Sequence, residues 1–217
     1  TEQSLPGSFG RMASLVRLEI VIGELEYLPG SFGKDHKILS EVIVIGNRLK
    51  YLPQSIGELE KLWSLRVSNN QLTSLPESIG NLRSSVNGKG VVLDISHNQL
   101  KSLPESIGHG NIGFLYGNFN RLASLPESIG QLENLLILQV QNNQLSSLPE
   151  SIGKLDKMRV LLAWSNNLTT LPYSVGNLKS LQFVDFRHNN ITKLPPTINK
   201  WNNIEYFYTA GNKVCND

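Results

Sequence analysis

The fold of this chain is decided by a stretch that reads LLILQVQNNQL over residues 135–145. Leu138 and Val140 are two residues apart, so an extended strand directs both side chains to one face. Ile137 and Gln139 then point to the opposite face. The pattern L-x-x-L-x-L-x-x-N-x-L therefore predicts a short, half-buried strand that ends in a turn at an asparagine.

The same pattern recurs along the whole chain, and a leucine–proline step marks each copy. Successive prolines are 23, 24, 23, 28, 22, 23, 23 and 23 residues apart. A nearly fixed period of this size predicts a repeat solenoid, in which every repeat is one unit that stacks on its neighbours. We expect the strands to stack in parallel, about 4.8 Å apart. The nine prolines are Pro6, Pro29, Pro53, Pro76, Pro104, Pro126, Pro149, Pro172 and Pro195.

An asparagine follows almost every expected strand. A primary amide has both a donor and an acceptor, so it can satisfy backbone groups that a turn would otherwise bury without partners. We therefore expect an asparagine ladder that links each turn to the next. Only the first full repeat departs from the pattern, with Gly23. The ladder residues are Asn47, Asn70, Asn98, Asn120, Asn143, Asn166, Asn189 and Asn212.

The second half of the repeat reads LPESIG and predicts a short helical segment. Pro149 suits the first turn of such a helix, because its missing N–H is no loss there. Ile152 and Leu155 share one helical face, three residues apart. We expect the recurring Glu and Ser to be solvated helix-start residues, and Gly153 to relieve crowding where the chain bends back.

The full repeat, L-P-E-S-I-G-x-L-x-x-L-x-x-L-x-L-x-x-N-x-L, resembles the leucine-rich repeats of Ras-group intracellular proteins of animals and plants. It is also similar to bacterial leucine-rich repeat proteins, including those of spirochaetes and some plant-pathogen effectors. This resemblance implies an α/β leucine-rich repeat solenoid, a right-handed horseshoe with a parallel β-sheet on its concave face. The convex side would carry short helical, 3-10 or extended segments. The implied role is to bind another protein across the concave face, with no cofactor.

The length and composition of the chain limit the domain organisation, the classes of partner and the location that we expect. The repeats cover nearly all 217 residues, so we expect one domain over residues 1–217, of about nine repeats, which is a piece of a longer protein. The formal net charge of +2 argues against a nucleic-acid partner, and the lack of a long apolar run argues against membrane insertion. The single cysteine, Cys215, cannot form a disulfide-bonded cap, which favours a cytoplasmic over a secreted location.

Two neighbouring repeats break the period. Five extra residues make residues 84–90 a polar, glycine-rich surface loop, expected to leave the inner face undisturbed. In the next repeat Gly110 and Gly117 stand where other repeats have large apolar residues. We expect a local bend or a cavity there, with Phe114, Tyr116 and Phe119 as possible compensation; an error in the repeat alignment is the alternative.

No catalytic or metal site is expected. Asp94–His97 and Asp185–His188 each offer only two ligands, whereas a zinc site needs three or four. The two pairs would also lie too far apart to share an ion, and no nucleophile or phosphate-binding motif appears. Two N-x-T sequons, at Asn167 and Asn190, follow from the repeat pattern itself.

The outward positions of the later strands become aromatic, which is the composition of a binding surface. We therefore expect a non-catalytic module that binds another protein with its concave face. Two alternatives stay open: a substrate-targeting domain of a larger bacterial effector, and a secreted or surface protein that recognises host or carbohydrate ligands. The predicted partner-binding residues are Tyr116, Phe119, Leu162, Trp164, Asp185, Arg187, His188, Tyr206 and Tyr208.

Overall fold

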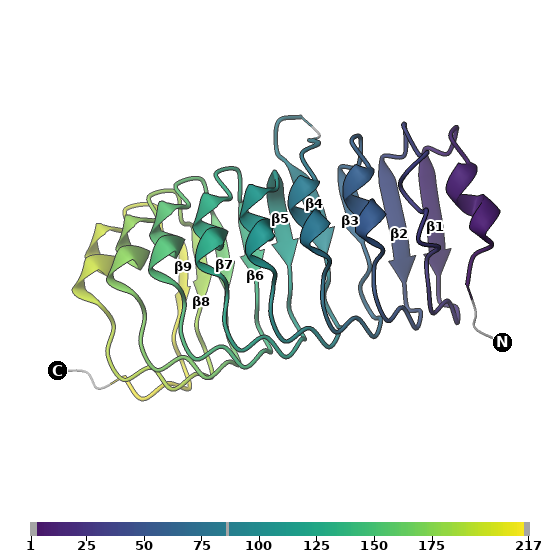
Figure 1. The fold of residues 1–217 in the computed structure, drawn as a ribbon. Coiled ribbons are helices and arrows are strands. Elements are labelled where there is room, and N and C mark those ends of the chain that lie inside the picture. Colours follow the sequence, from purple (N-terminus) through teal and green to yellow (C-terminus); the bar gives the residue numbers. More distant parts are fainter. Residues whose placement is uncertain (1–3, 86, 215–217) are drawn as a thin grey trace.

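The computed structural model describes residues 4–85 and 87–214, and these residues form one open parallel sheet (Figure 1). Each strand pairs with the strand of the next repeat, as the period predicts. Cys215 lies outside the described residues. The strands, in chain order, are β1 (Arg17–Val21), β2 (Glu41–Ile45), β3 (Ser64–Arg66), β4 (Val91–Asp94), β5 (Ile112–Tyr116), β6 (Ile137–Gln139), β7 (Val160–Leu162), β8 (Phe183–Asp185) and β9 (Tyr206–Tyr208).

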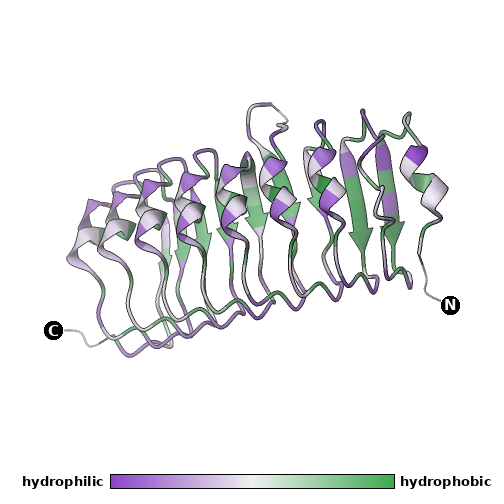
Figure 2. Cartoon of the chain, in the orientation of Figure 1, coloured by the Kyte–Doolittle hydropathy of each residue, from purple (hydrophilic) through white to green (hydrophobic). Residues whose placement is uncertain are grey.

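Short 3-10 helices form the layer opposite the sheet. Figure 1 shows the strands set closer together than these helices, so the open face of the sheet is the concave one. In Figure 2 the strands are mostly apolar and the helices mostly polar or neutral. No helix in the described ranges is long and apolar enough to cross a membrane. The helices are η1 (Gly7–Arg11), η2 (Gln54–Glu58), η3 (Glu77–Asn81), η4 (Glu105–His109), η5 (Glu127–Gln131), η6 (Glu150–Lys154), η7 (Tyr173–Asn177) and η8 (Pro196–Lys200).

The core lies between the two layers and is filled by the repeat's apolar positions. Leu138, Val140 and Ile152 are fully buried, whereas Ile137 and Gln139 are half-buried on the open face. The predicted strand phase is therefore confirmed. Because every repeat contributes the same positions, the core runs continuously through the solenoid.

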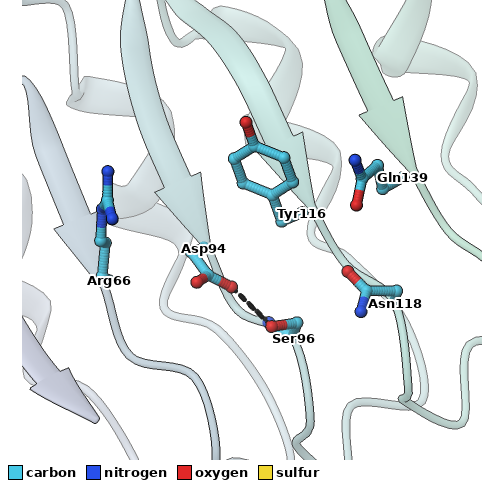
Figure 3. A pocket seen from close by; sticks show the side chains of 6 residues that line it. All are labelled: Arg66, Asp94, Ser96, Tyr116, Asn118 and Gln139. Carbon is cyan, nitrogen blue, oxygen red and sulfur yellow. Dashed lines mark hydrogen bonds between the residues drawn. The ribbon is translucent and has the colours of Figure 1, made fainter. Parts of the chain in front are cut away.

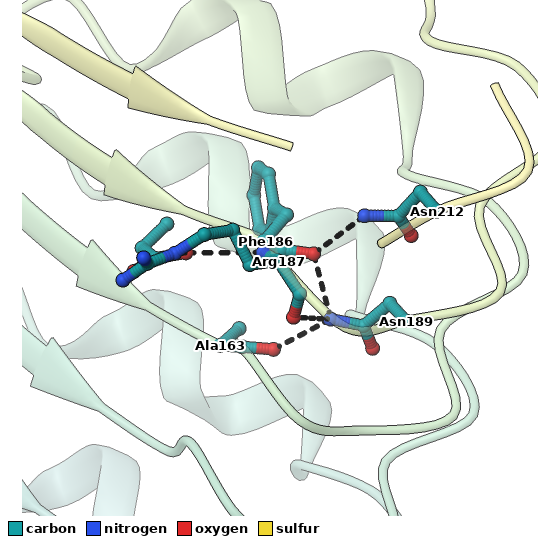
Figure 4. Close-up of polar contacts among 6 residues, drawn as sticks. Ala163, Phe186, Arg187, Asn189 and Asn212 are labelled. Carbon is teal, nitrogen blue, oxygen red and sulfur yellow. Dashed lines mark hydrogen bonds and ion pairs between the residues drawn. The ribbon is translucent and has the colours of Figure 1, made fainter. Parts of the chain in front are cut away.

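The asparagine ladder is present as predicted. Asn189 donates from Nδ2 to the carbonyl oxygen of Ala163 in the preceding repeat, at 3.0 Å, and to that of Phe186 in its own repeat, at 2.9 Å (Figure 4). Its Oδ1 accepts the backbone N–H of Leu168 at 3.0 Å. Asn212 repeats the arrangement one turn later, donating to the Phe186 carbonyl at 2.8 Å. Each amide therefore joins two consecutive turns.

The convex layer corrects two expectations. Pro149 is not inside the helix but precedes it in extended backbone (φ −68°, ψ 150°), where its carbonyl accepts the Ile152 N–H at 3.1 Å. Ser151 is not solvated but buried, because η6 packs closely against η5. The Glu127 carboxylate, on η5, accepts the Ser151 N–H at 3.2 Å and so caps the next repeat's helix.

Gly153 relieves crowding, as expected, because the next helix approaches it closely. A Cβ at this position would lie 2.3 Å from the carbonyl oxygen of Ser174, closer than side chains pack. Glycines at the same place in other repeats, such as Gly130, meet the following serine at similar distances. The glycine of LPESIG therefore sets the spacing between neighbouring repeats.

The loop at 84–90 contacts the short repeat that follows it, and the two irregularities occur together. A Cβ on Gly113 would lie 1.6 Å from the Lys89 carbonyl oxygen, so the loop backbone occupies the space of a side chain. The β4–β5 register shifts at this point, between Val91 and Val92. The distortion is therefore a shift in strand register, which differs from the bend or cavity expected at Gly110 and Gly117. Contrary to expectation, the loop disturbs the sheet, because its backbone lies against β5.

Gly110 lacks the leucine side chain that other repeats have at this position. The side chain of Ile112 fills the space, and not the aromatic residues expected to do so. Ile112 is fully buried, and its Cγ1 would lie 3.4 Å from a Cβ on Gly110. Phe114 and Tyr116 do not compensate, because both lie on the open face, and Phe119 is 41 % exposed. At Gly117 a Cβ would meet nothing closer than 3.7 Å, which leaves space there for a methyl group.

Candidate binding face

The open face is built by strand alternation and parallel register. Each strand sends out residues two apart, and parallel pairing lines them up across the sheet. Side chains from repeats 23 residues apart in sequence thus become neighbours. One such column joins the middle of β1 and β2 to the last residue of each strand from β3 to β9. It contains Glu19, Ile43, Arg66, Asp94, Tyr116, Gln139, Leu162, Asp185 and Tyr208.

Three rings at the C-terminal end of this face form a cluster, which we call the aromatic cluster: Phe183, Tyr206 and Tyr208. The ring centroid of Phe183 lies 5.4 Å from that of Tyr206 and 5.6 Å from that of Tyr208. Tyr206 and Tyr208 are 51 % and 38 % exposed, so the cluster faces solvent. Aromatic rings at such distances attract each other and present a rigid apolar surface.

Arg187 borders the aromatic cluster and is held in place from two sides. It donates from Nε and Nη2 to the Asp185 carboxylate, with distances of 3.0 and 2.6 Å, and its guanidinium lies 5.0 Å from the Tyr208 ring centroid. The bonded carboxylate raises the pKa of Arg187. Asp185 itself is 2 % exposed, so it orients Arg187 and presents little of its own surface to solvent.

Leu162, Trp164 and His188 lie next to this cluster. Leu162 and Trp164 are half-buried on β7 and just after it, one strand from Asp185 and Arg187. His188 is exposed in the turn after β8, in left-handed backbone with φ 54°. With the aromatic cluster, these residues lie on or just after the neighbouring strands β7 to β9.

Tyr116 and Phe119 lie apart from the other predicted residues. Two strand spacings of about 4.8 Å separate β5 from β7, the nearest strand of the other group, or roughly 10 Å. Phe119 stacks on His97, with ring centroids 4.2 Å apart and an interplanar angle of 14°. The predicted residues therefore fall into two groups, one over β7 to β9 and one around β5.

A second feature, which the sequence prediction did not include as a site, surrounds Tyr116. An open hollow of about 340 Å³ lies over β3 to β6, and its lining is almost entirely polar. We call it the polar hollow. Its signal in the sequence was a run of polar residues at the outward positions of three consecutive repeats. The lining residues are Arg66, Asp94, Ser96, Tyr116, Asn118 and Gln139 (Figure 3).

Three of the four residues in the two Asp–His pairs, Asp94, His97 and Asp185, contact other side chains. Asp94 accepts hydrogen bonds from Ser96, whereas Asp185 holds Arg187. His97 stacks on Phe119, and no group of three or more His, Cys, Asp or Glu residues converges within the part of the chain that the structure describes.

Comparison with known proteins identifies the repeat. The family model Leucine Rich Repeat matches residues 61–82, 91–109, 134–155 and 180–201. Together with the nine-strand solenoid, these matches show that the chain is a leucine-rich repeat protein. No curated protein matches its sequence.

Three solved structures with the same fold come from longer chains. The ectodomain of the Arabidopsis thaliana receptor kinase GASSHO1/SCHENGEN3, in complex with CASPARIAN STRIP INTEGRITY FACTOR 2, is 25% identical with a TM-score of 0.72, over 99% of this chain and 29% of that one. The PEPR1–AtPEP1 structure is 27% identical with a TM-score of 0.66, over 96% and 33%. Toll from the Drosophila Toll–Spatzle complex is 22% identical with a TM-score of 0.82, over 97% and 30%. This chain therefore spans about a third of their length.

Proposed function

We propose that this chain is a non-catalytic protein-binding module that engages a polypeptide partner with the concave face over β7 to β9. One observation carries the proposal: the aromatic cluster is exposed, and a preorganised arginine borders it. Tyrosine, tryptophan and arginine are the residues that contribute most to binding energy at protein interfaces. Because Asp185 already fixes Arg187, a partner would meet a rigid surface and lose less entropy on binding.

The likeness to receptor ectodomains supports a polypeptide partner. GASSHO1/SCHENGEN3 was solved in complex with CASPARIAN STRIP INTEGRITY FACTOR 2, and PEPR1 with AtPEP1. We extend to this chain only the kind of ligand, a peptide or protein, because sequence identity is about a quarter. Binding rather than catalysis also fits the chemistry of the face, where Asp94 and Asp185 are already hydrogen-bonded to neighbouring side chains.

Substitution of two anchors tests this proposal. We expect the double variant Trp164→Ala and Tyr208→Ala to lose capture of polypeptides selected on the unmodified chain from a displayed library. Each truncated anchor should cost about 1–2 kcal/mol or more, so affinity should fall at least tenfold.

The matched control is Tyr173→Ala. Tyr173 is 65 % exposed but belongs to η7 on the convex side, so its loss should leave capture unchanged. Undiminished capture by a folded double variant, or equal losses from both faces, would refute the assignment to the concave face.

A further inference from the structure

The polar hollow contains a cation and an anion that face the same space without pairing. Arg66 and Asp94 are direct partners in the β3–β4 register, yet no ion pair joins them. Asp94 is held elsewhere: its Oδ1 accepts the Ser96 N–H at 3.1 Å and the Ser96 hydroxyl at 2.7 Å (Figure 3). The second carboxylate oxygen and the Arg66 guanidinium are left for a ligand. Their charges cancel, so the hollow favours no net ionic charge.

Four of the lining side chains make no hydrogen bond to any other described residue: Arg66, Tyr116, Asn118 and Gln139. Asn118 is 9 % exposed as a residue, and its unpartnered amide lines the hollow. Burial raises the pKa of the Tyr116 phenol above its ordinary value of 10, which already leaves the hydroxyl protonated as a donor at neutral pH. Amides and hydroxyls both donate and accept. The hollow therefore matches a ligand whose groups do the same.

Tyr116 gives the hollow an aromatic centre. Figure 3 shows its ring face-on, with Arg66, Asp94 and Ser96 on one side and Asn118 and Gln139 on the other. A ligand with a flat ring could stack on the Tyr116 ring. Polar groups around the edge of the ligand would then reach the side chains on both sides of Tyr116. The volume of about 340 Å³ is at the lower end of the roughly 300–1,000 Å³ typical of small-molecule sites.

We propose that the polar hollow binds a neutral pyranose ring, either as a free saccharide or as one unit of a glycan chain. The ring's C–H face would stack on Tyr116. Its hydroxyls would donate to Asp94 and accept from Arg66, with Asn118 and Gln139 completing the hydrogen bonds on the far side. This site is separate from the aromatic cluster over β7 to β9, so it does not depend on the proposed function.

Titration with matched sugars, followed by NMR, tests this site. The probes are the methyl glycosides of glucose, galactose and mannose, an array of neutral oligosaccharides, and methyl glucuronide, which adds one carboxylate to a glucoside. We expect at least one neutral probe to shift the side-chain amide signals of Asn118 and Gln139 saturably. Methyl glucuronide should bind more weakly than methyl glucoside, because its carboxylate would lose water in a hollow where the charges of Arg66 and Asp94 cancel. Signals from the monosaccharides point to a free sugar, and signals from the array alone point to a glycan chain.

Three variants separate stacking from charge. Tyr116→Ala should weaken sugar binding about tenfold, whereas Tyr116→Phe, which keeps the ring, should retain most of it. Asp94→Asn keeps an oxygen for Ser96 but loses an acceptor for the sugar, so it should weaken binding by a similar factor. Tyr208→Ala, in the aromatic cluster, should leave sugar binding unchanged. Thermal unfolding of each variant checks that it is folded.

Two results would overturn the proposal. One is the absence of saturable shifts with every neutral probe. The other is tighter binding of methyl glucuronide, further strengthened by Asp94→Asn and lost in Arg66→Gln, which would mark a carboxylate site instead.

Discussion

In every full repeat but the first, the turn after the strand depends on the side-chain amide of one asparagine. Its acceptor and its donors serve backbone groups of two repeats at once, as Asn189 does for Leu168, Ala163 and Phe186. The residue before it adopts left-handed backbone, as His188 does with φ 54°. Both features follow from turning a buried chain sharply while keeping its polar groups paired.

Removal of one ladder amide should destabilise the protein. Asn143 accepts the Leu122 N–H at 2.9 Å and donates to the carbonyls of Gly117 and Val140, each at 3.0 Å. Asn143→Ala orphans these groups, so we expect the free energy of unfolding in urea to fall by about 1–3 kcal/mol. Asn167→Ala is the control, because that exposed side chain is outside the ladder. An equal effect of both substitutions would contradict the ladder's role.

Isoleucine is unfavourable at position 22, because of its backbone conformation and its exposure. It adopts φ 51°, where a β-branched residue is strained, and it is 85 % exposed, so its side chain adds little packing. Ile22→Asn should raise the free energy of unfolding by about 1 kcal/mol, since asparagine tolerates left-handed backbone. Val21→Asn, at an exposed strand position, should give no gain. A loss of stability in Ile22→Asn would show that the strain is not the dominant effect.

His36 makes stability depend on pH. It is 1 % exposed, its Nδ1 accepts the Gly33 N–H at 3.1 Å, and burial lowers its pKa from the ordinary 6.5. The unfolded chain therefore takes up a proton at a higher pH than the folded protein. The contribution of neutral His36 is fully present above about pH 7 and is lost as pH falls below about 6.5. Urea unfolding between about pH 7.5 and 5 should show this loss, and His36→Phe should show a smaller one; identical pH profiles would contradict the assignment.

At the scale of the elements, glycines set the spacing of the convex layer. A Cβ on Gly153 would lie 2.3 Å from the Ser174 carbonyl oxygen, whereas one on Gly117 would meet nothing closer than 3.7 Å. Gly153→Ala should therefore destabilise the protein by about 1–3 kcal/mol or more. Gly117→Ala should be neutral or stabilising by up to about 1 kcal/mol. Thermal unfolding of the two variants compares them directly, and the reverse order would refute this view of the packing.

The strand, the helix and the turn could be predicted from the sequence because each has a local cause. Leu138 and Val140 alternate, Asn143 ends the strand, and the LPESIG segment begins the next layer. The predictions that were wrong concern features that depend on contacts between repeats. The burial of Ser151 and the contact of Gly113 with Lys89 arise only when neighbouring repeats are stacked.

At the scale of the whole molecule, the period fixed which face each residue occupies but not how residues group on that face. Tyr116 and Tyr208 occupy the same column, yet three strands lie between β5 and β9, so they belong to different surfaces. Asp185 was expected at the surface, but the long side chain of Arg187 binds it and leaves it buried. The polar hollow depends on side chains from four consecutive strands and the turns after them, which one repeat examined alone does not reveal.

The central claim is that a polypeptide partner binds the concave face over β7 to β9. Hydroxyl-radical footprinting, with and without a selected binding polypeptide, tests it most directly. A partner bound to this face should protect Trp164, Tyr206 and Tyr208 from oxidation and leave Tyr173, on the convex side, as reactive as before. Protection of Tyr173 with none at Tyr206 and Tyr208 would place the partner on the convex side and contradict the claim.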